Sequence, residues 1–241
     1  MKRSGTHKPD YGVDAPNVIR NLFVIGLILL ILSFLVPFAS LRLNAIIVGT
    51  IFLAEAFLML LYSKVGKFRH RDRMLSLHNW TGKENILDVG TGGGLLLIGA
   101  AKRITTGKAI GIDIWNKEDL LKNNPERVRN NAGVENVSER IEVLNEDIQK
   151  TTFHNETFDV ILSNLCLHNI YSRDGRKTAC QEIYRILKPG GVAIISDFRK
   201  TGEYEREFRN KKMDVRKHGP FLLDTFPPLT IVVARKEASK N

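Results

Sequence analysis

Cysteine is scarce in this sequence. Only Cys166 and Cys180 occur among the 241 residues. They are too few for a disulfide framework and too far apart in the chain for a zinc-ligand pair. We therefore predict free thiols in a reducing compartment and no metal site. Internal repeats and low-complexity segments are also missing, and 43% of the residues are apolar. This composition excludes disorder as the general state and supports a substantial hydrophobic core.

Charge is almost missing from two stretches near the N-terminus. Residues 21–38 contain no charged side chain, and residues 43–62 contain only Glu55. Each stretch is long enough to cross a bilayer as a helix. The connection at residues 39–42 is short, so the two helices must form a hairpin whose flanks lie on the same side of the membrane.

Both flanks of this hairpin are basic. Residues 1–20 carry four Lys or Arg against two Asp, and residues 64–73 carry five against one. Because cytosolic flanks are enriched in Lys and Arg, the pattern predicts an integral membrane protein with its large domain in the cytosol. The flanks hold most of the formal net charge of +10. The bilayer is therefore an expected partner, and nucleic acid is not.

Four segments follow from this pattern. They are a basic cytosolic N-terminus (1–20), two transmembrane helices (21–63), a basic juxtamembrane linker (64–78) and a large soluble domain (79–241). A cleaved signal peptide is disfavoured, because the first span begins about twenty residues in and a second span follows at once. A buried pair of soluble helices stays an alternative. Glu55 is either a functional acid within the span or a protonated or partnered one with no function.

The soluble domain alternates apolar strand-like runs with helical ones, which is typical of a parallel α/β sheet. The sequence predicts a Rossmann-like, seven-stranded, mostly parallel sheet flanked by helices. The expected strands are 86–89, 109–114, 141–144, 158–162, 192–196, 221–223 and 229–234. The expected helices are 95–104, 118–132, 174–187 and 202–216. The last helix is charged and is either solvated or lies against anionic lipid.

A glycine-rich loop follows the first expected strand, with Gly90, Gly92, Gly93 and Gly94. Glycines there allow a sharp turn and leave backbone N–H groups uncovered beside a helix N-terminus, which suits a nucleotide-like ligand. The dinucleotide fingerprint G-x-G-x-x-G is incomplete, because Leu95 stands at its sixth position.

Acidic and polar residues follow the strands, where the ligand of an open α/β sheet lies. Asp88 at the head of the glycine loop would repel a pyrophosphate but suits a ligand with an ammonium group. Asp113 follows the second strand at the spacing of an acid that holds ribose hydroxyls. Asp147 follows the third strand, and Asn164, Cys166 and His168 follow the fourth.

These motifs together resemble class I S-adenosylmethionine-dependent methyltransferases of the type 11/25 kind, a group that includes quinone- and sterol-biosynthesis methyltransferases. The motifs are D-V-G-T-G-G-G from Asp88, G-I-D ending at Asp113, N-E-D ending at Asp147, F-D-V-I-L-S-N ending at Asn164, and L-K-P-G-G from residue 187. The resemblance covers residues 79–236 and leaves out the hairpin. It implies S-adenosylmethionine as the cofactor and a small-molecule or lipid-like methyl acceptor.

The resemblance also implies roles for individual residues around the cofactor. The glycine loop, with Thr91, would pack against the methionine portion, and Asp88 would lie near its amino group. Asp113 would accept hydrogen bonds from both ribose hydroxyls. The residues expected near the adenine are Ile114, Trp115, Asp147 and Ile148, and Asn164 would line the site close to the reactive methyl. Asp147 could instead be a cap or turn residue, and Trp115 could cover the sheet edge.

Methyl transfer from a sulfonium is an in-line displacement, so much of its catalysis can come from alignment. A base is needed only where the acceptor must lose a proton, and His168 is the candidate. A loop histidine that binds backbone or lines the pocket is the alternative, and Cys166 is more typical of a small apolar filler than of a nucleophile. The expected function is membrane-anchored methyl transfer. A non-catalytic S-adenosylmethionine-binding membrane adaptor is the runner-up, and a dehydrogenase is third.

Overall fold

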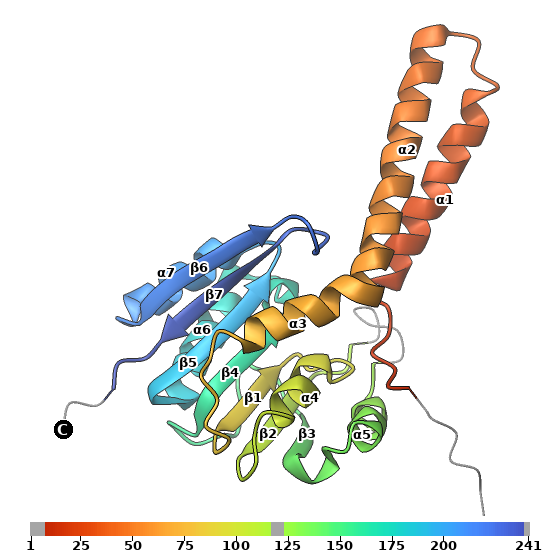
Figure 1. The fold of residues 1–241 in the computed structure, drawn as a ribbon. Coiled ribbons are helices and arrows are strands. Elements are labelled where there is room, and N and C mark those ends of the chain that lie inside the picture. Colours follow the sequence, from red (N-terminus) through yellow and green to blue (C-terminus); the bar gives the residue numbers. More distant parts are fainter. Residues whose placement is uncertain (1–7, 117–122, 239–241) are drawn as a thin grey trace, which may run out of the picture.

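The computed structural model describes residues 8–116 and 123–238. A helical hairpin, α1 (Pro16–Ser33) and α2 (Ala39–Leu61), projects from an α/β domain (Figure 1). Both helices are long and apolar enough to cross a membrane, and only 11% and 17% of their most apolar windows are buried. The connection lies at residues 34–38 rather than 39–42, because α1 ends at Ser33 and α2 begins at Ala39. α1 also begins earlier than expected, at Pro16, and proline is a favoured first residue of a helix.

Two glycines bring the hairpin helices into close contact. A Cβ atom added at Gly26 would lie 2.9 Å from the carbonyl oxygen of Gly49, and one added at Gly49 would lie 2.9 Å from that of Gly26. Small residues at a helix crossing allow such an approach, which is how membrane helices associate without a hydrophobic driving force between them.

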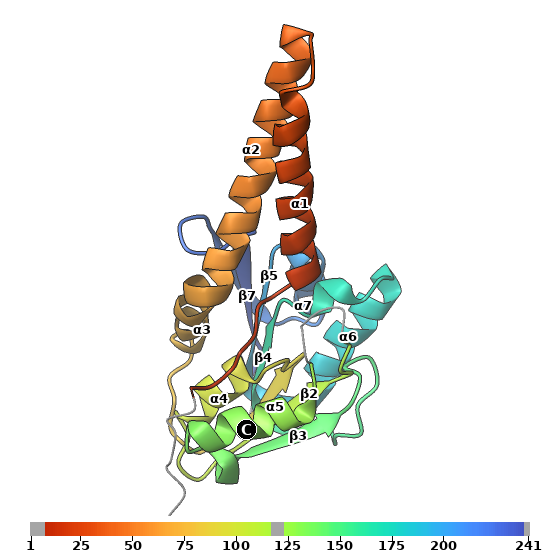
Figure 2. The same ribbon diagram turned by 90° about the vertical axis from the view of Figure 1, so that its right-hand side faces the viewer.

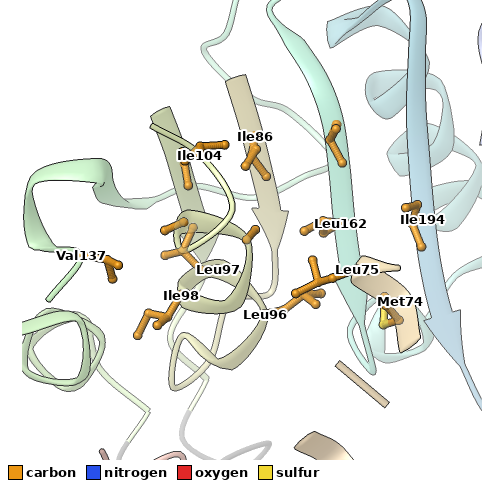
Figure 3. Close-up of a cluster of buried hydrophobic side chains, with 14 of the residues drawn as sticks. Met74, Leu75, Ile86, Leu96, Leu97, Ile98, Ile104, Val137, Leu162 and Ile194 are labelled. Atoms are coloured by element: carbon orange, nitrogen blue, oxygen red, sulfur yellow. The ribbon is translucent and has the colours of Figure 1, made fainter. Parts of the chain in front are cut away.

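The segment expected to be a juxtamembrane linker, residues 64–78, is largely helical. A π-helical turn (Tyr62–Gly66) continues α2 into α3 (Lys67–Leu75), which packs on the sheet. Met74 and Leu75 at its end are fully buried and point toward α4 and the strands (Figure 3). Their burial explains why the segment folds as a helix despite its high charge. The hairpin therefore joins the domain through continuous helix.

The seven strands form one mixed sheet in the order β3-β2-β1-β4-β5-β7-β6. The first five strands run parallel, and β7 pairs antiparallel with both β5 and β6. Strand order reverses between β1 and β4, the place where such sheets bind ligands. The bounds are β1 (Asn85–Val89), β2 (Lys108–Asp113), β3 (Ile141–Asn145), β4 (Phe158–Asn164), β5 (Leu187–Asp197), β6 (Asp214–Phe221) and β7 (Leu229–Arg235). The predicted seven-stranded α/β fold is confirmed.

Helices cover both faces of this sheet. α3 packs on one face with α4 (Leu95–Ala101) and α5 (Pro125–Val134), and their side chains form one apolar cluster with alternate strand residues. α6 (Arg173–Ile186) and α7 (Thr201–Asn210) cover the other face and form the second cluster. Short 3-10 turns stand at Ser138–Arg140 and Leu167–Asn169. This division follows from the alternation of strand side chains between faces.

Three expected elements differ from the structure. The helix predicted to run to residue 216 ends at Asn210, where Lys212 adopts a left-handed conformation, and the segment from Asp214 pairs with β7 as an edge strand. The charges of the segment from Asp214 suggested a helix. The segment is extended because it pairs with β7. The strand expected at 221–223 ends at Phe221. The helix expected from 118 is α5, which begins at Pro125 behind an Asn124 cap; residues 117–122 lie outside the described residues.

The N-terminal segment before α1 ties the hairpin to the domain. The buried Lys67 ammonium donates to the carbonyl oxygens of Tyr11 (2.9 Å) and Gly12 (2.6 Å) and lies 3.3 Å from the Asp14 carboxylate. The Arg127 guanidinium of α5 donates to the carbonyl oxygen of Asp10 at 2.8 Å. These contacts hold the foot of the hairpin beyond the carboxyl ends of the parallel strands (Figures 1 and 2).

Candidate active site

One large cavity, of about 1150 Å³, opens at the carboxyl ends of the parallel strands. Ten of the twelve residues that the sequence singles out line it, namely Asp88, Gly90, Thr91, Gly92, Asp113, Ile114, Asp147, Ile148, Asn164 and His168. Gly94 and Trp115 are not among its lining residues. The cavity exceeds the ~300–1,000 Å³ of an ordinary small-molecule pocket, so it has room for two ligands side by side.

The glycine loop owes its shape to three residues with positive φ: Gly90 (71°), Gly92 (52°) and Gly94 (83°). A Cβ atom at Gly90 would collide with the Cys166 side chain, so this cysteine packs directly against the loop. A Cβ atom at Gly94 would lie 2.8 Å from Val128 of α5. Gly94 therefore shapes the start of α4 rather than the cavity wall.

Asp88 is buried beneath this loop. One of its carboxylate oxygens accepts hydrogen bonds from the Thr91 hydroxyl (2.9 Å) and the Leu97 backbone N–H (3.0 Å). Burial, together with the nearby Asp113 carboxylate, raises the pKa of Asp88 to about 7. Asp88 therefore holds the loop to α4, and a cation bound in the cavity would favour its charged form.

Asp113 closes β2 and faces the glycine loop. Its carboxylate accepts hydrogen bonds from the backbone N–H groups of Gly92 (2.9 Å) and Trp115 (2.7 Å). The carboxylate is thereby fixed at the cavity edge. Trp115 packs against the apolar cluster on the α4 face, while Ile114 is 62% exposed.

Two cavity residues follow β3, and one of them is buried while the other is exposed. Ile148 is 5% exposed and belongs to the cluster under α6 and α7. Asp147 is exposed, and its carboxylate accepts a hydrogen bond from the Gln149 backbone N–H at 2.9 Å. Asp147 therefore stabilises a turn and also lines the cavity.

His168 lies in the 3-10 turn after β4, beside a carboxylate that sequence reasoning missed. Its Nδ1 atom is 2.7 Å from one oxygen of Asp197, although the approach lacks hydrogen-bond geometry and acts as a charge contact. The other Asp197 oxygen accepts from the His168 backbone N–H (3.1 Å) and the Tyr204 hydroxyl (3.1 Å). The signal for Asp197 was its place directly after the fifth strand, at the same sheet edge as the other acids.

A second group of lining residues comes from the hairpin, and sequence reasoning singled out only Glu55 among them. Val18 and Leu22 of α1 line the cavity, as do Glu55 and Met59 of α2 and Tyr62 just beyond it. The α2 positions are spaced i, i+4, i+7, which places them on one helix face. That spacing was visible in the sequence, but nothing there placed the face against the domain.

Comparison with known proteins shows what kind of domain contains this cavity. Residues 87–195 match the family model described as a methyltransferase domain. The chain contains an S-adenosylmethionine-dependent methyltransferase domain. S-adenosylmethionine is its methyl donor, and it fits this cavity, because the glycine loop, which has no side chains at Gly90 and Gly92, meets the Asp113 carboxylate at one cavity wall. The loop N–H groups that the sequence predicted to be uncovered are instead hydrogen-bonded within the protein at Gly90, Thr91, Gly92 and Gly94.

The curated relatives of the methyltransferase domain are distant. The chain is 32% identical over 117 residues to the ubiquinone/menaquinone biosynthesis C-methyltransferase UbiE of Hydrogenovibrio crunogenus, covering 48% of this chain and 42% of that protein. It is 31% identical over 118 residues to UbiE of Escherichia coli, with 48% and 43% covered. The chain thus spans less than half the length of the curated relatives that it matches.

Solved structures share the fold of the methyltransferase domain. A SAM-dependent methyltransferase from Aquifex aeolicus superposes with a TM-score of 0.54 at 19% identity, covering 68% of this chain and 88% of that one. The [4+2]-cyclase SpnF superposes with a TM-score of 0.58 at 16% identity, covering 71% and 81%. At these identities the likeness concerns the fold alone.

Proposed function

We propose that this protein is a membrane-anchored methyltransferase that moves the methyl group of S-adenosylmethionine to a small hydrophobic or lipid-like acceptor. The observation that carries the proposal is a single cavity lined both by the glycine loop and by the foot of the hairpin. A bilayer-crossing hairpin with basic flanks would hold the domain at the cytosolic face. The names of the curated relatives support an apolar acceptor, since they refer to quinone biosynthesis.

The donor would lie along the loop and the ends of β2 and β3. In this arrangement Gly90, Thr91 and Gly92 contact its methionine portion, and the buried Asp88 attracts its ammonium group. Asp113 accepts hydrogen bonds from the ribose hydroxyls with the lone pairs that the backbone leaves open. The adenine contacts are Ile114, Asp147 and Ile148, while Gly94 and Trp115 support the wall from behind.

The donor supplies an electrophilic methyl group on a positively charged sulfur. The protein aligns the acceptor atom with that carbon, so the carbon–sulfur bond breaks as the bond to the acceptor forms. Asn164 lines the cavity near this point. An acceptor that loses a proton would pass it to His168, whose imidazolium the buried Asp197 stabilises. The demethylated donor, S-adenosylhomocysteine, then leaves.

A second candidate is a membrane adaptor that binds S-adenosylmethionine without turnover. The observation in its favour is the fold shared with the [4+2]-cyclase SpnF, since a protein of this fold can have a function other than methyl transfer.

Labelled methyl transfer in vesicles tests the proposal and its orientation together. The full-length protein is prepared in sealed vesicles of its native membrane lipids, either inside-out or right-side-out, and given S-adenosylmethionine labelled in the methyl group. We expect label in the lipid fraction of inside-out vesicles alone, since the charged donor does not cross a bilayer.

The matched blank is Asp113→Ala, which removes the proposed ribose contact. Label confined to right-side-out vesicles would reverse the orientation. Donor binding with no label in any lipid would favour the adaptor.

A further inference from the structure

The foot of the hairpin forms one wall of the cavity. Val18 and Leu22 come from α1, and Glu55 and Met59 come from α2. Each pair is four residues apart, which places its members one turn apart on the same helix face. Tyr62 continues the α2 face three residues beyond Met59. This wall is therefore formed by the cavity-facing side of the hairpin, its inner face, and not by the α/β domain.

Four residues that line the cavity have a buried polar atom without a hydrogen-bond partner among the described residues, namely Tyr62, Asn123, Asn164 and His168. Tyr62 is 4% exposed, and its hydroxyl lies near the Asn164 side chain but makes no hydrogen bond of good geometry. The side-chain oxygen of Asn164, at the end of β4, also has none. Buried polar atoms without partners cost free energy, which a ligand that satisfies them recovers. A ligand hydroxyl could accept from the Tyr62 phenol and donate to the Asn164 oxygen.

Away from Tyr62 the hairpin wall of the cavity is apolar at Met59, and it ends at the acidic side chain of Glu55. Seven residues of helix place Glu55 about 10 Å from Tyr62 along α2, with Met59 between them. An ionisable side chain within an apolar span is costly unless it faces a polar partner or a cavity. Glu55 faces the cavity, so an acceptor that reaches it gains by donating a hydrogen bond. Further apolar lining of the cavity comes from Phe198, Phe226 and Pro227.

We infer that the hairpin is an acceptor-binding element as well as an anchor. The acceptor is an amphiphile of the bilayer whose hydroxyl-bearing head lies at Tyr62 and Asn164. Its apolar body runs along the inner faces of α1 and α2, past Met59 toward Glu55. The inference rests on the proposed methyl transfer and adds which residues select the acceptor.

A cavity-filling substitution with a matched control tests this. Met59→Trp fills the acceptor wall, whereas Leu58→Trp adds the same bulk at a 39% exposed position of α2 outside the cavity. Both full-length variants are assayed for labelled methyl transfer into vesicles made with increasing amounts of the native membrane lipid extract. We expect Met59→Trp to raise the half-saturating lipid concentration at least tenfold, with Leu58→Trp unchanged and donor affinity equal in both.

Tyr62→Phe provides a second measurement that a structural role would not move. Its hydroxyl makes no hydrogen bond of good geometry in the described protein, so the melting temperature should stay nearly constant. The half-saturating lipid concentration should rise about tenfold, the equivalent of one lost hydrogen bond. An active wild type with unaltered Met59→Trp and Tyr62→Phe variants would overturn the inference and leave the proposed function standing. A wild type that binds donor but labels no lipid would overturn both.

Discussion

At the residue scale, His168 and Asp197 have separate roles in the proposed site: His168 is the candidate base, and Asp197 is the carboxylate held beside it. Asp197 is fully buried and accepts hydrogen bonds from two backbone N–H groups, those of His168 and Phe198, and from the Tyr204 hydroxyl. Its carboxylate is thus held in place 2.7 Å from the His168 ring. Although this approach lacks hydrogen-bond geometry, the charge of the carboxylate attracts a proton to Nδ1, which would leave Nε2 to act as the base.

Substitution of His168 tests this division. His168→Asn removes the base but keeps a side chain of modest size beside Phe198. We expect kcat to fall about 10²-fold or more, the lower end of general-base contributions, with donor affinity unchanged. Asp197→Asn should lower kcat less, because the imidazole remains. Unchanged kcat in His168→Asn would mean that the acceptor loses no proton to this residue.

Sequence reasoning at this scale found the residues whose position follows from strand order. Asp88, Asp113, Asn164 and His168 all stand at or just beyond the carboxyl ends of parallel strands, which meet at one edge. Trp115 was expected near the adenine but packs on the apolar cluster, because a left-handed backbone conformation at this residue sets where its ring points. Local sequence does not encode that choice.

At the element scale, α3 joins the hairpin to the sheet through a buried histidine. His70 is fully buried, and its Nε2 lies 2.6 Å from the Ser196 hydroxyl of β5. Burial, together with the neighbouring Arg73 guanidinium, lowers the pKa of His70 to about 4. Arg73 also forms an ion pair with Asp224 in the β6–β7 loop. Sequence alone suggested a linker here, because its charges hid the buried face of the helix.

The low pKa of His70 predicts acid sensitivity. Between about pH 6.5 and pH 4 the unfolded chain binds a proton at this histidine and the folded chain does not, so stability falls as pH falls. The loss amounts to at most about 3 kcal/mol. Denaturant unfolding of the full-length protein, followed by tryptophan fluorescence at pH 7.5, 6 and 5, measures it.

The matched variant for this measurement is His70→Gln. The raised pKa of Asp88 acts in the opposite direction, since it adds stability as pH falls below about 7. Both proteins keep Asp88, so the difference between their pH profiles isolates His70. Parallel profiles would contradict the assignment.

At the scale of the whole molecule, hairpin and domain make one site. The glycine loop and the motifs after the strands predicted the fold class and the residues that line the proposed donor half of the cavity, because local residue patterns specify them. The acceptor half depends on how α1 and α2 meet the domain. That meeting relies on long-range contacts such as those of Lys67 with Tyr11 and Gly12. No local sequence pattern predicts such long-range pairs. The sequence could therefore predict a hairpin but not that the hairpin lines the cavity.

The central claim is that the cavity binds S-adenosylmethionine through the glycine loop and Asp113. Calorimetry of the full-length protein in detergent micelles tests it most directly, with S-adenosylmethionine, S-adenosylhomocysteine and NAD titrated separately. We expect one molecule of either sulfur compound to bind per chain, no heat from NAD, and at least tenfold weaker binding in Asp113→Ala, as for a lost hydrogen bond to a charged group. Binding of NAD without binding of S-adenosylmethionine would contradict the account.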